Sequence, residues 1–98
     1  MIESIRRQFP ALSRTYNNRP LVFLDGPAGT QVPDLVIDAA SDYYRTSNAN
    51  SHGHFITSEE TTDIIEWTRE RCAALTNAES TECISLGANM TSLAFKLS

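Results

Sequence analysis

The chain has 98 residues and a net charge of −4, from 8 lysines and arginines against 12 aspartates and glutamates. Hydrophobic residues make up 41% of it, so the composition excludes collagen-like and strongly disordered proteins. The acidic balance argues against nucleic-acid binding, and no apolar run approaches the roughly 20 residues that span a bilayer. We therefore expect a cytoplasmic protein, although its length falls short of the roughly 100–150 residues of a typical domain.

The first third of the chain predicts a helix, a turn and a buried strand. Residues 1–12 have helical apolar spacing, and we expect Pro10 to stop this helix. Residues 17–20 predict a turn because Asn, Asn and Pro favour one. Residues 21–24 form an apolar run without alternation, typical of a strand covered on both faces, which ends at the turn-rich loop 25–30.

The remaining residues predict three helices and a second strand. Apolar residues at three-to-four spacing indicate helices near 33–46 and 58–76, separated by a polar loop at 47–55. Residues 82–86 are a candidate strand, and a third helix is expected over 89–98. These elements together indicate an α/β fold.

The helix near 58–76 carries a capping-box signature, with Thr57 or Ser58 as the cap and Glu60 completing the box. We expect one side of this helix to face a core, because its members share helical spacing: Thr61, Ile64, Ile65, Thr68, Cys72 and Leu75. Cys72 on this side and Cys83 in the second strand are expected to be small buried residues rather than nucleophiles or disulfide partners.

The turn Gly87-Ala88-Asn89 leads directly into the third helix. A helix N-terminus has unpaired N–H groups and a partial positive charge, and small residues let an anion approach it closely. Asn89, Thr91 and Ser92 could add side-chain donors. The turn therefore predicts a phosphate site, and the alternative is a plain helix cap.

Loop 25–30 is a second candidate ligand site, because it follows a predicted strand and ligands gather at the carboxyl ends of strands in open α/β sheets. The alternative is a turn that caps the next helix. In the third candidate, the loop containing His52 and His54, two histidines suggest a metal, but no third ligand lies nearby in sequence. A polar loop without a role, or a loop that places His52 beside a ligand, are the other interpretations.

Four segments resemble, in the same order, segments of one known enzyme family. Residues 23–33 are similar to "YLDNAATTQVP", and residues 48–52 to the start of "NANVHR". Residues 69–75 resemble "ARERVAALL", and residues 82–93 resemble "EIVFTRGTTEAIN". That family is the class V aminotransferases and cysteine desulfurases, and the resemblance covers essentially the whole chain.

The resemblance implies the N-terminal part of a fold-type I enzyme that depends on pyridoxal 5′-phosphate (PLP). We expect three main helices and two short strands, truncated, with residues 1–20 as an N-terminal arm and residues 21–98 as the start of the cofactor-binding domain. The family is typically a homodimer and acts on amino-acid substrates, by cleaving the C–S bond of cysteine or by transferring amino groups.

The resemblance also assigns site residues. The phosphate-binding turn of the family corresponds to Ala88, Asn89 and Met90. The substrate end of its pocket corresponds to five residues in two loops: Asp25, Gly26, Pro27, Ala28 and His52. Gly26-Pro27 replaces the family's Asn-Ala, and Gly53 replaces the arginine that follows the histidine, so the substrate class stays open.

No catalytic residue is expected in this chain. The family's Schiff-base lysine, its aspartate at the pyridine nitrogen and its ring-stacking histidine would all lie beyond Ser98. Lys96, the only lysine, falls outside the family's lysine motif, so we expect the chain alone to be inactive. The alternatives are a small interaction module that self-associates and, third, a metal-binding protein that uses His52 and His54.

Overall fold

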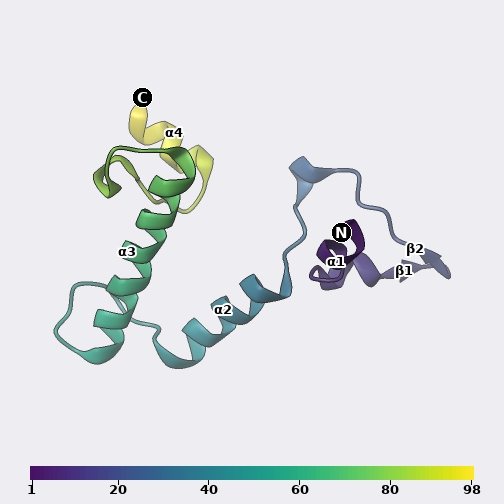
Figure 1. Cartoon of the computed structure of the whole chain (residues 1–98), viewed down its shortest axis with the longest axis horizontal. Helices are drawn as coiled ribbons and strands as arrows, with labels where there is room; N and C mark the ends of the chain where they lie inside the picture. Colours follow the sequence, from purple (N-terminus) through teal and green to yellow (C-terminus); the bar gives the residue numbers. More distant parts are fainter. The chain divides into compact units, whose positions relative to one another are not determined.

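The chain is described here by a computed structural model of residues 1–98, in which it divides into two units, Met1–Thr46 and Ser47–Ser98. Each unit is mainly helical, and the only sheet is a two-stranded one in the first unit (Figure 1). None of the helices has both the length and the apolar composition that crossing a bilayer requires.

The N-terminal helix is shorter than expected. Helix α1 spans Ile2–Arg6, and a separate 3₁₀ helix, η1, spans Pro10–Ser13. The prediction of one helix over residues 1–12 was therefore wrong. Pro10 begins the second element rather than ending the first, because its missing N–H and fixed φ suit the first position of a helical turn.

The turn expected at residues 17–20 is confirmed, and it closes a small hairpin. Strand β1 (Thr15–Tyr16) pairs antiparallel with β2 (Arg19–Pro20). Asn17 and Asn18 between them have φ angles of 49° and 58°. Positive φ at both central residues is typical of the type I′ two-residue hairpin loop, and asparagine tolerates such angles better than most residues.

The two strands predicted from apolar runs do not form. Residues 21–24 have no regular secondary structure, and Val22 and Leu24 are 71% and 91% exposed. Residues 82–86 contain the end of a 3₁₀ helix, η3 (Thr81–Cys83), instead of a strand. A strand needs a ladder of hydrogen bonds to a neighbouring strand, and the run 21–24 has only one such bond, from the Leu21 N–H to the Arg14 carbonyl at 2.9 Å. The only sheet pairs β1 with β2, so neither run joins a sheet.

Helix α2 spans Asp34–Thr46, as predicted to within one residue. It follows the short 3₁₀ helix η2 (Gly26–Ala28) and Gly29, whose φ of 157° suits glycine. The Asp34 N–H donates to the Gln8 carbonyl at 2.8 Å, which ties the start of α2 to the N-terminal residues of the same unit.

Helix α3 spans Ile56–Thr76 and begins two residues before the predicted start. Its N-cap is Phe55, without a side-chain cap, so the predicted capping box was wrong. The Glu60 carboxylate instead accepts a hydrogen bond from the Ser47 hydroxyl at 2.5 Å. Helix α4 spans Met90–Leu97, close to the predicted range.

Asn77 ends α3 in the left-handed conformation, with a φ of 53°, and the Ala78 N–H donates to the Ala73 carbonyl at 2.9 Å. We expect Asn77→Val to destabilise this end by about 1–2 kcal/mol, because a β-branched residue is disfavoured at positive φ. Asn77→Gly should be neutral or stabilising. The rate of amide exchange in the last turn of α3 measures the effect of each substitution. Equal exchange rates in the two variants would contradict this account of the cap.

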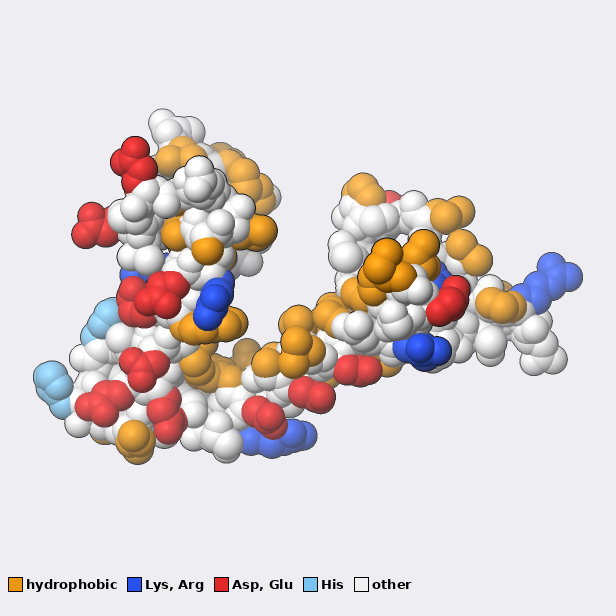
Figure 2. Space-filling model, in the orientation of Figure 1, with side chains coloured by type: hydrophobic (Ala, Val, Ile, Leu, Met, Phe, Trp, Pro, Cys, Tyr) orange, Lys and Arg blue, Asp and Glu red, His pale blue; other side chains and the backbone are white.

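Hydrophobic side chains are largely uncovered in both units. Ala73 is the only buried hydrophobic residue, and Figure 2 shows hydrophobic side chains at the surface along the chain. On the side of α3 that was expected to face a core, Leu75 is 87% exposed. Cys72 is half-buried and Cys83 is exposed, so the expected burial of Cys83 is not found.

Candidate functional site

The turn before α4 presents two free backbone donors. Asn89 is the N-cap, and its side-chain Oδ1 accepts a hydrogen bond from the Ser92 N–H at 2.9 Å. The N–H groups of Met90 and Thr91 have no partner in the structure. Two adjacent unpaired amides at the positive end of a helix form a donor set that suits an anionic oxygen.

Gly87 lets this turn lie close to α4. A Cβ atom at Gly87 would stand 2.7 Å from Cδ2 of Leu93, nearer than side chains pack. Glycine therefore allows the backbone of the turn to rest on Leu93, one turn into the helix. The close approach positions residues 88–90 against the helix that they cap.

The donor set at this turn fits a phosphoryl group. It combines the two free amides with the hydroxyls of Thr91 and Ser92, all donors and none of them an anion. The carbonyl end of Asn89 is committed to the cap, so only its amide nitrogen could serve a ligand. The phosphate site and the helix cap, given above as alternatives, are therefore compatible. Asn89 caps the helix, while the N–H groups of Met90 and Thr91 stay free to donate.

Loop 47–54 is fastened to the first turns of α3 by hydroxyl side chains. Ser58 is fully buried, and its hydroxyl accepts from the Gly53 N–H at 2.7 Å. The same hydroxyl donates to the Asn50 carbonyl in a short hydrogen bond. Ser58 thus bridges the two ends of the turn from Asn50 to Gly53.

Thr62 holds the middle of this turn. The His52 N–H donates to Thr62 Oγ1 at 2.9 Å, and the Thr62 hydroxyl donates to the Ser58 carbonyl at 2.9 Å. His52 itself has a φ of 65°, in the left-handed region that residues other than glycine seldom adopt. Its side chain remains exposed.

The base of the loop is held in the same way. The Ser47 hydroxyl donates to Glu60 at 2.5 Å, and the Thr61 hydroxyl donates to the Ser47 carbonyl at 3.0 Å. Ser47 and Thr61 are both buried. The loop is therefore attached to α3 at its base and at its tip.

Gly53 is required by this packing. A Cβ atom there would stand 2.9 Å from Ser58 Oγ and 2.6 Å from Cε1 of Phe55. We expect Gly53→Ala to cost about 1–3 kcal/mol of local stability, because the buried hydroxyl cannot move away. Faster amide exchange over residues 50–54 measures this cost. Gly26→Ala is the matched control, since a Cβ at Gly26 would meet nothing within 4 Å; equal effects of the two changes would contradict the packing argument.

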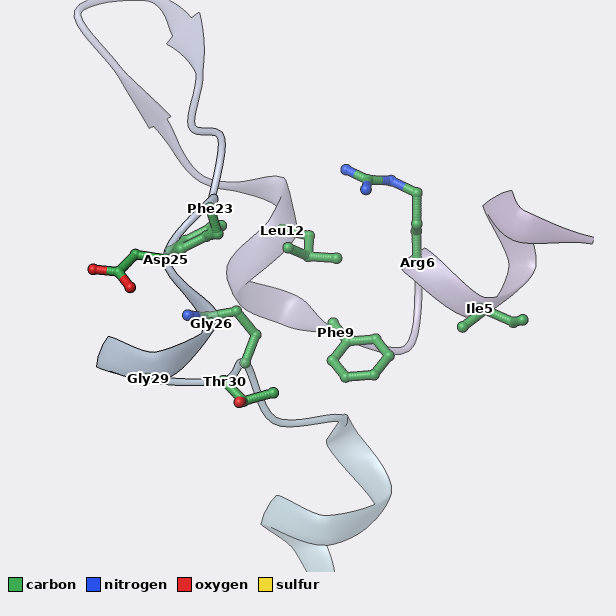
Figure 3. A pocket seen from close by; sticks show the side chains of 10 residues that line it. Ile5, Arg6, Phe9, Leu12, Phe23, Asp25, Gly26, Gly29 and Thr30 are labelled. Atoms are coloured by element: carbon green, nitrogen blue, oxygen red, sulfur yellow. The ribbon is translucent and has the colours of Figure 1, made fainter.

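The loop near residues 25–30 borders a groove in the first unit. Ten residues line it: Ile5, Arg6, Phe9, Leu12, Phe23, Asp25, Gly26, Gly29, Thr30 and Gln31. Figure 3 shows the side chains of Phe9, Leu12 and Thr30 turned toward this groove, and the Asp25 carboxylate turned away from them. Of the predicted substrate-end residues, Asp25 and Gly26 line the groove, whereas Pro27 and Ala28 do not.

The structure does not bring the predicted site residues together in one unit. Asp25 to Ala28 belong to the first unit, and His52 and residues 88–90 belong to the second. Within the second unit, loop 47–54 is bonded to the start of α3, whereas the turn at 87–89 follows its end. Helix α3 has 21 residues, a length of about 32 Å at 1.5 Å per residue. No group of three or more histidine, cysteine, aspartate or glutamate side chains comes together as metal ligands would.

Comparison with known proteins establishes the family. The sequence profile described as Aminotransferase class-V matches residues 22–97. The chain belongs to the class-V aminotransferase family. The matched range contains the turn at 87–89, the whole of loop 47–54 and the loop at 25–30, so all three candidate segments belong to the family's sequence. The resemblance seen in the four motifs is thereby confirmed.

Curated relatives in this family include a probable cysteine desulfurase from Vibrio cholerae, 45% identical over 85 residues, which are 85% of this chain and 21% of the relative. A cysteine desulfurase from Synechococcus elongatus is 43% identical over 83 residues, 83% of this chain and 13% of the relative. A probable cysteine desulfurase from Streptomyces coelicolor is 39% identical over 100 residues, 90% of this chain and 24% of the relative. The chain thus spans roughly a quarter or less of the length of these class-V relatives.

Sequence reasoning missed Ser58 and Thr62 as contacts of the His52 loop. Both were visible as hydroxyl residues four apart, on one face of a helix that follows a polar loop. Ser58 was interpreted as a cap instead, since the capping-box pattern uses the same residue types. In this class-V chain the hydroxyls at the helix start serve the preceding loop.

Proposed function

We propose that this chain is the segment of a PLP-dependent, cysteine-desulfurase-like enzyme that anchors the cofactor phosphate and lines the substrate end of the pocket. The observation that carries the proposal is the pair of unpaired amides, Met90 and Thr91, at the turn before α4, which lies within the range that the family profile matches. Membership of the class-V family and the names of the relatives support it.

In this proposal Ala88, Asn89 and Met90 form the phosphate-binding turn. The Met90 N–H donates to a phosphate oxygen, and the amide of Thr91 extends the donor set. Asn89 keeps the turn in shape through its bond to Ser92. The positive end of α4 favours the negative charge, and Gly87 keeps the turn close to the helix.

The substrate end is assigned to two loops. Asp25, Gly26, Pro27 and Ala28 border the amino-acid substrate, and His52 lies beside it, where an imidazole can stack on the substrate or exchange a proton with it. PLP, when bound, supplies the electron sink for chemistry at the substrate's α-carbon. The residues of this chain orient the cofactor and the substrate around that chemistry.

The lysine that attaches PLP is assigned to a part of the enzyme outside these 98 residues. Lys96 lies on α4, six residues after Met90, and we do not assign it the attachment of PLP. The chain alone is therefore proposed to be inactive. The complete enzyme is proposed to be a cytoplasmic homodimer.

A second candidate function is a small interaction module that associates with itself. The exposed hydrophobic side chains favour it, because uncovered apolar surface drives association. Size-exclusion chromatography of the 98-residue chain distinguishes the module from the enzyme segment. A stable, discrete oligomer favours the module. A polydisperse or aggregating chain favours the enzyme segment, whose apolar surface belongs against the rest of the enzyme.

The proposed activity is tested with the natural polypeptide that contains these residues. We expect the purified protein to carry PLP and to release alanine and sulfur from L-cysteine. Amino transfer from L-cysteine or other amino acids to 2-oxo acids is the control reaction within the same family. A protein that binds no PLP at micromolar concentrations, or acts on no amino acid, would contradict the proposal.

A further inference from the structure

We infer that Ser58 and Thr62 are positioning residues that set the direction in which the His52 side chain leaves the backbone, along its Cα–Cβ bond. The inference rests on the proposed place of His52 beside the substrate. The two hydroxyls bind the backbone of the loop, so they would act on His52 through that backbone.

The hydrogen bonds act on both peptide groups that flank the His52 Cα. The Thr62 hydroxyl holds the His52 N–H at 2.9 Å, and the Ser58 hydroxyl holds the Gly53 N–H at 2.7 Å. Because peptide groups are planar, holding both of them fixes φ and ψ of the residue between. The direction of the His52 Cα–Cβ bond follows from these two angles.

His52 needs such support because its φ is 65°. Residues other than glycine seldom occupy the left-handed region, so a free loop would move most of its population to negative φ. A change in the sign of φ would turn the imidazole to another side of the loop. The two hydroxyls therefore select the side of the loop from which the His52 side chain projects.

The Ser58 contact is shielded from water. Ser58 is fully buried, and its hydroxyl is shared between the Gly53 N–H and the Asn50 carbonyl. The bonds of Ser47 to Glu60 and Thr61 hold the base of the loop against the same helix. The tip of the loop thus has a rigid support on α3.

Thr68 on the same helix provides a matched control. Its hydroxyl donates to the Ile64 carbonyl at 2.7 Å, as the Thr62 hydroxyl donates to the Ser58 carbonyl. Both threonines are half-buried, but only Thr62 also accepts a bond from the loop. Among their hydrogen bonds, Thr62→Val and Thr68→Val therefore differ in the loop contact alone, and Thr62→Ser keeps the hydroxyl.

The first measurement is amide hydrogen exchange, resolved to single residues, in the natural polypeptide that contains the chain. We expect Thr62→Val to speed exchange at the His52 amide about tenfold, the effect of losing one net hydrogen bond, while residues 64–76 keep their rates. Thr62→Ser should restore the wild-type rate, and Thr68→Val should leave it unchanged. A His52 amide that exchanges like an unstructured peptide in the wild type, or a Thr62→Ser protein that behaves like Thr62→Val, would overturn the inference.

The second measurement separates positioning from structural support. We expect Thr62→Val to lower kcat/KM for the amino-acid substrate about tenfold at unchanged PLP content, and Thr62→Ser to restore it. Faster exchange without any change in kcat/KM would mean that the contact serves structure only, and would overturn the assigned role. A wild-type protein without activity on amino acids would instead refute the proposed function, while the exchange result would still decide whether the hydroxyls hold the loop.

Discussion

Replacing Met90 with proline is expected to weaken PLP binding about tenfold to a hundredfold in the enzyme that contains this segment. Proline removes the Met90 N–H, and hydrogen bonds to charged groups contribute about 1.5–3 kcal/mol. The helix should tolerate the change, because Met90 is the first residue of α4 and proline is favoured there. Asn89 already has the extended backbone, φ −166° and ψ 168°, that a following proline prefers.

Met90→Ala is the control for this prediction, since it removes the side chain and keeps the N–H. Its Kd for PLP, measured by spectroscopic titration, should stay within about twofold of the wild type, a difference of less than 0.5 kcal/mol. Equal losses in the alanine and proline variants would assign the effect to the methionine side chain. A proline variant that binds PLP normally would show that this amide does not contact the phosphate.

The isolated 98-residue chain is expected to contain helix but to lack a cooperative unfolding transition. Only Ala73 among its hydrophobic residues is buried, whereas Val22, Leu24 and Leu75 are largely exposed. At about 25 cal/mol per Å² of apolar surface, side chains in contact with water contribute little to folding. Far-UV circular dichroism should therefore show helix that melts gradually, and a dye for exposed apolar surface should bind.

The natural polypeptide of the class-V family is the comparison for this experiment. It should melt in one steep transition and bind little dye, because the rest of the enzyme covers the apolar surface. Glu79→Ala within the 98-residue chain is the control, since this exposed side chain lies outside the helices and its loss leaves the apolar surface unchanged. A steep thermal transition of the isolated chain without dye binding would contradict the expectation.

The three longer helices could be predicted from the sequence because their hydrogen bonds are local, whereas the single helix expected over residues 1–12 is two short elements. The ranges expected for α2, α3 and α4 differ from the structure by at most two residues at any end. The sequence could not show that the strands expected at 21–24 and 82–86 would fail to form. A strand forms only when another segment offers its backbone, and a local apolar pattern does not reveal that segment. The apolar pattern of each run describes an environment that these 98 residues do not provide.

The candidate site was partly visible in the sequence. Gly87-Ala88-Asn89 before a helix indicates an anion site by local chemistry, and the structure adds the unpaired amides of Met90 and Thr91. The contacts of Ser58 and Thr62 with the His52 loop were missed, because hydroxyl residues at a helix start also serve as caps and the sequence pattern does not separate the two uses. Only the three-dimensional course of the loop decides between these uses.

The central claim, that this chain anchors PLP for a lysine located elsewhere in the enzyme, is tested most directly by reduction of the PLP-loaded natural polypeptide with borohydride. This treatment attaches the cofactor permanently to the lysine that holds it, and peptide mass spectrometry then locates the label. We predict a label on a lysine outside residues 1–98 and none on Lys96, the only lysine within them. A label on Lys96, or no labelled lysine in the presence of saturating PLP, would contradict this account.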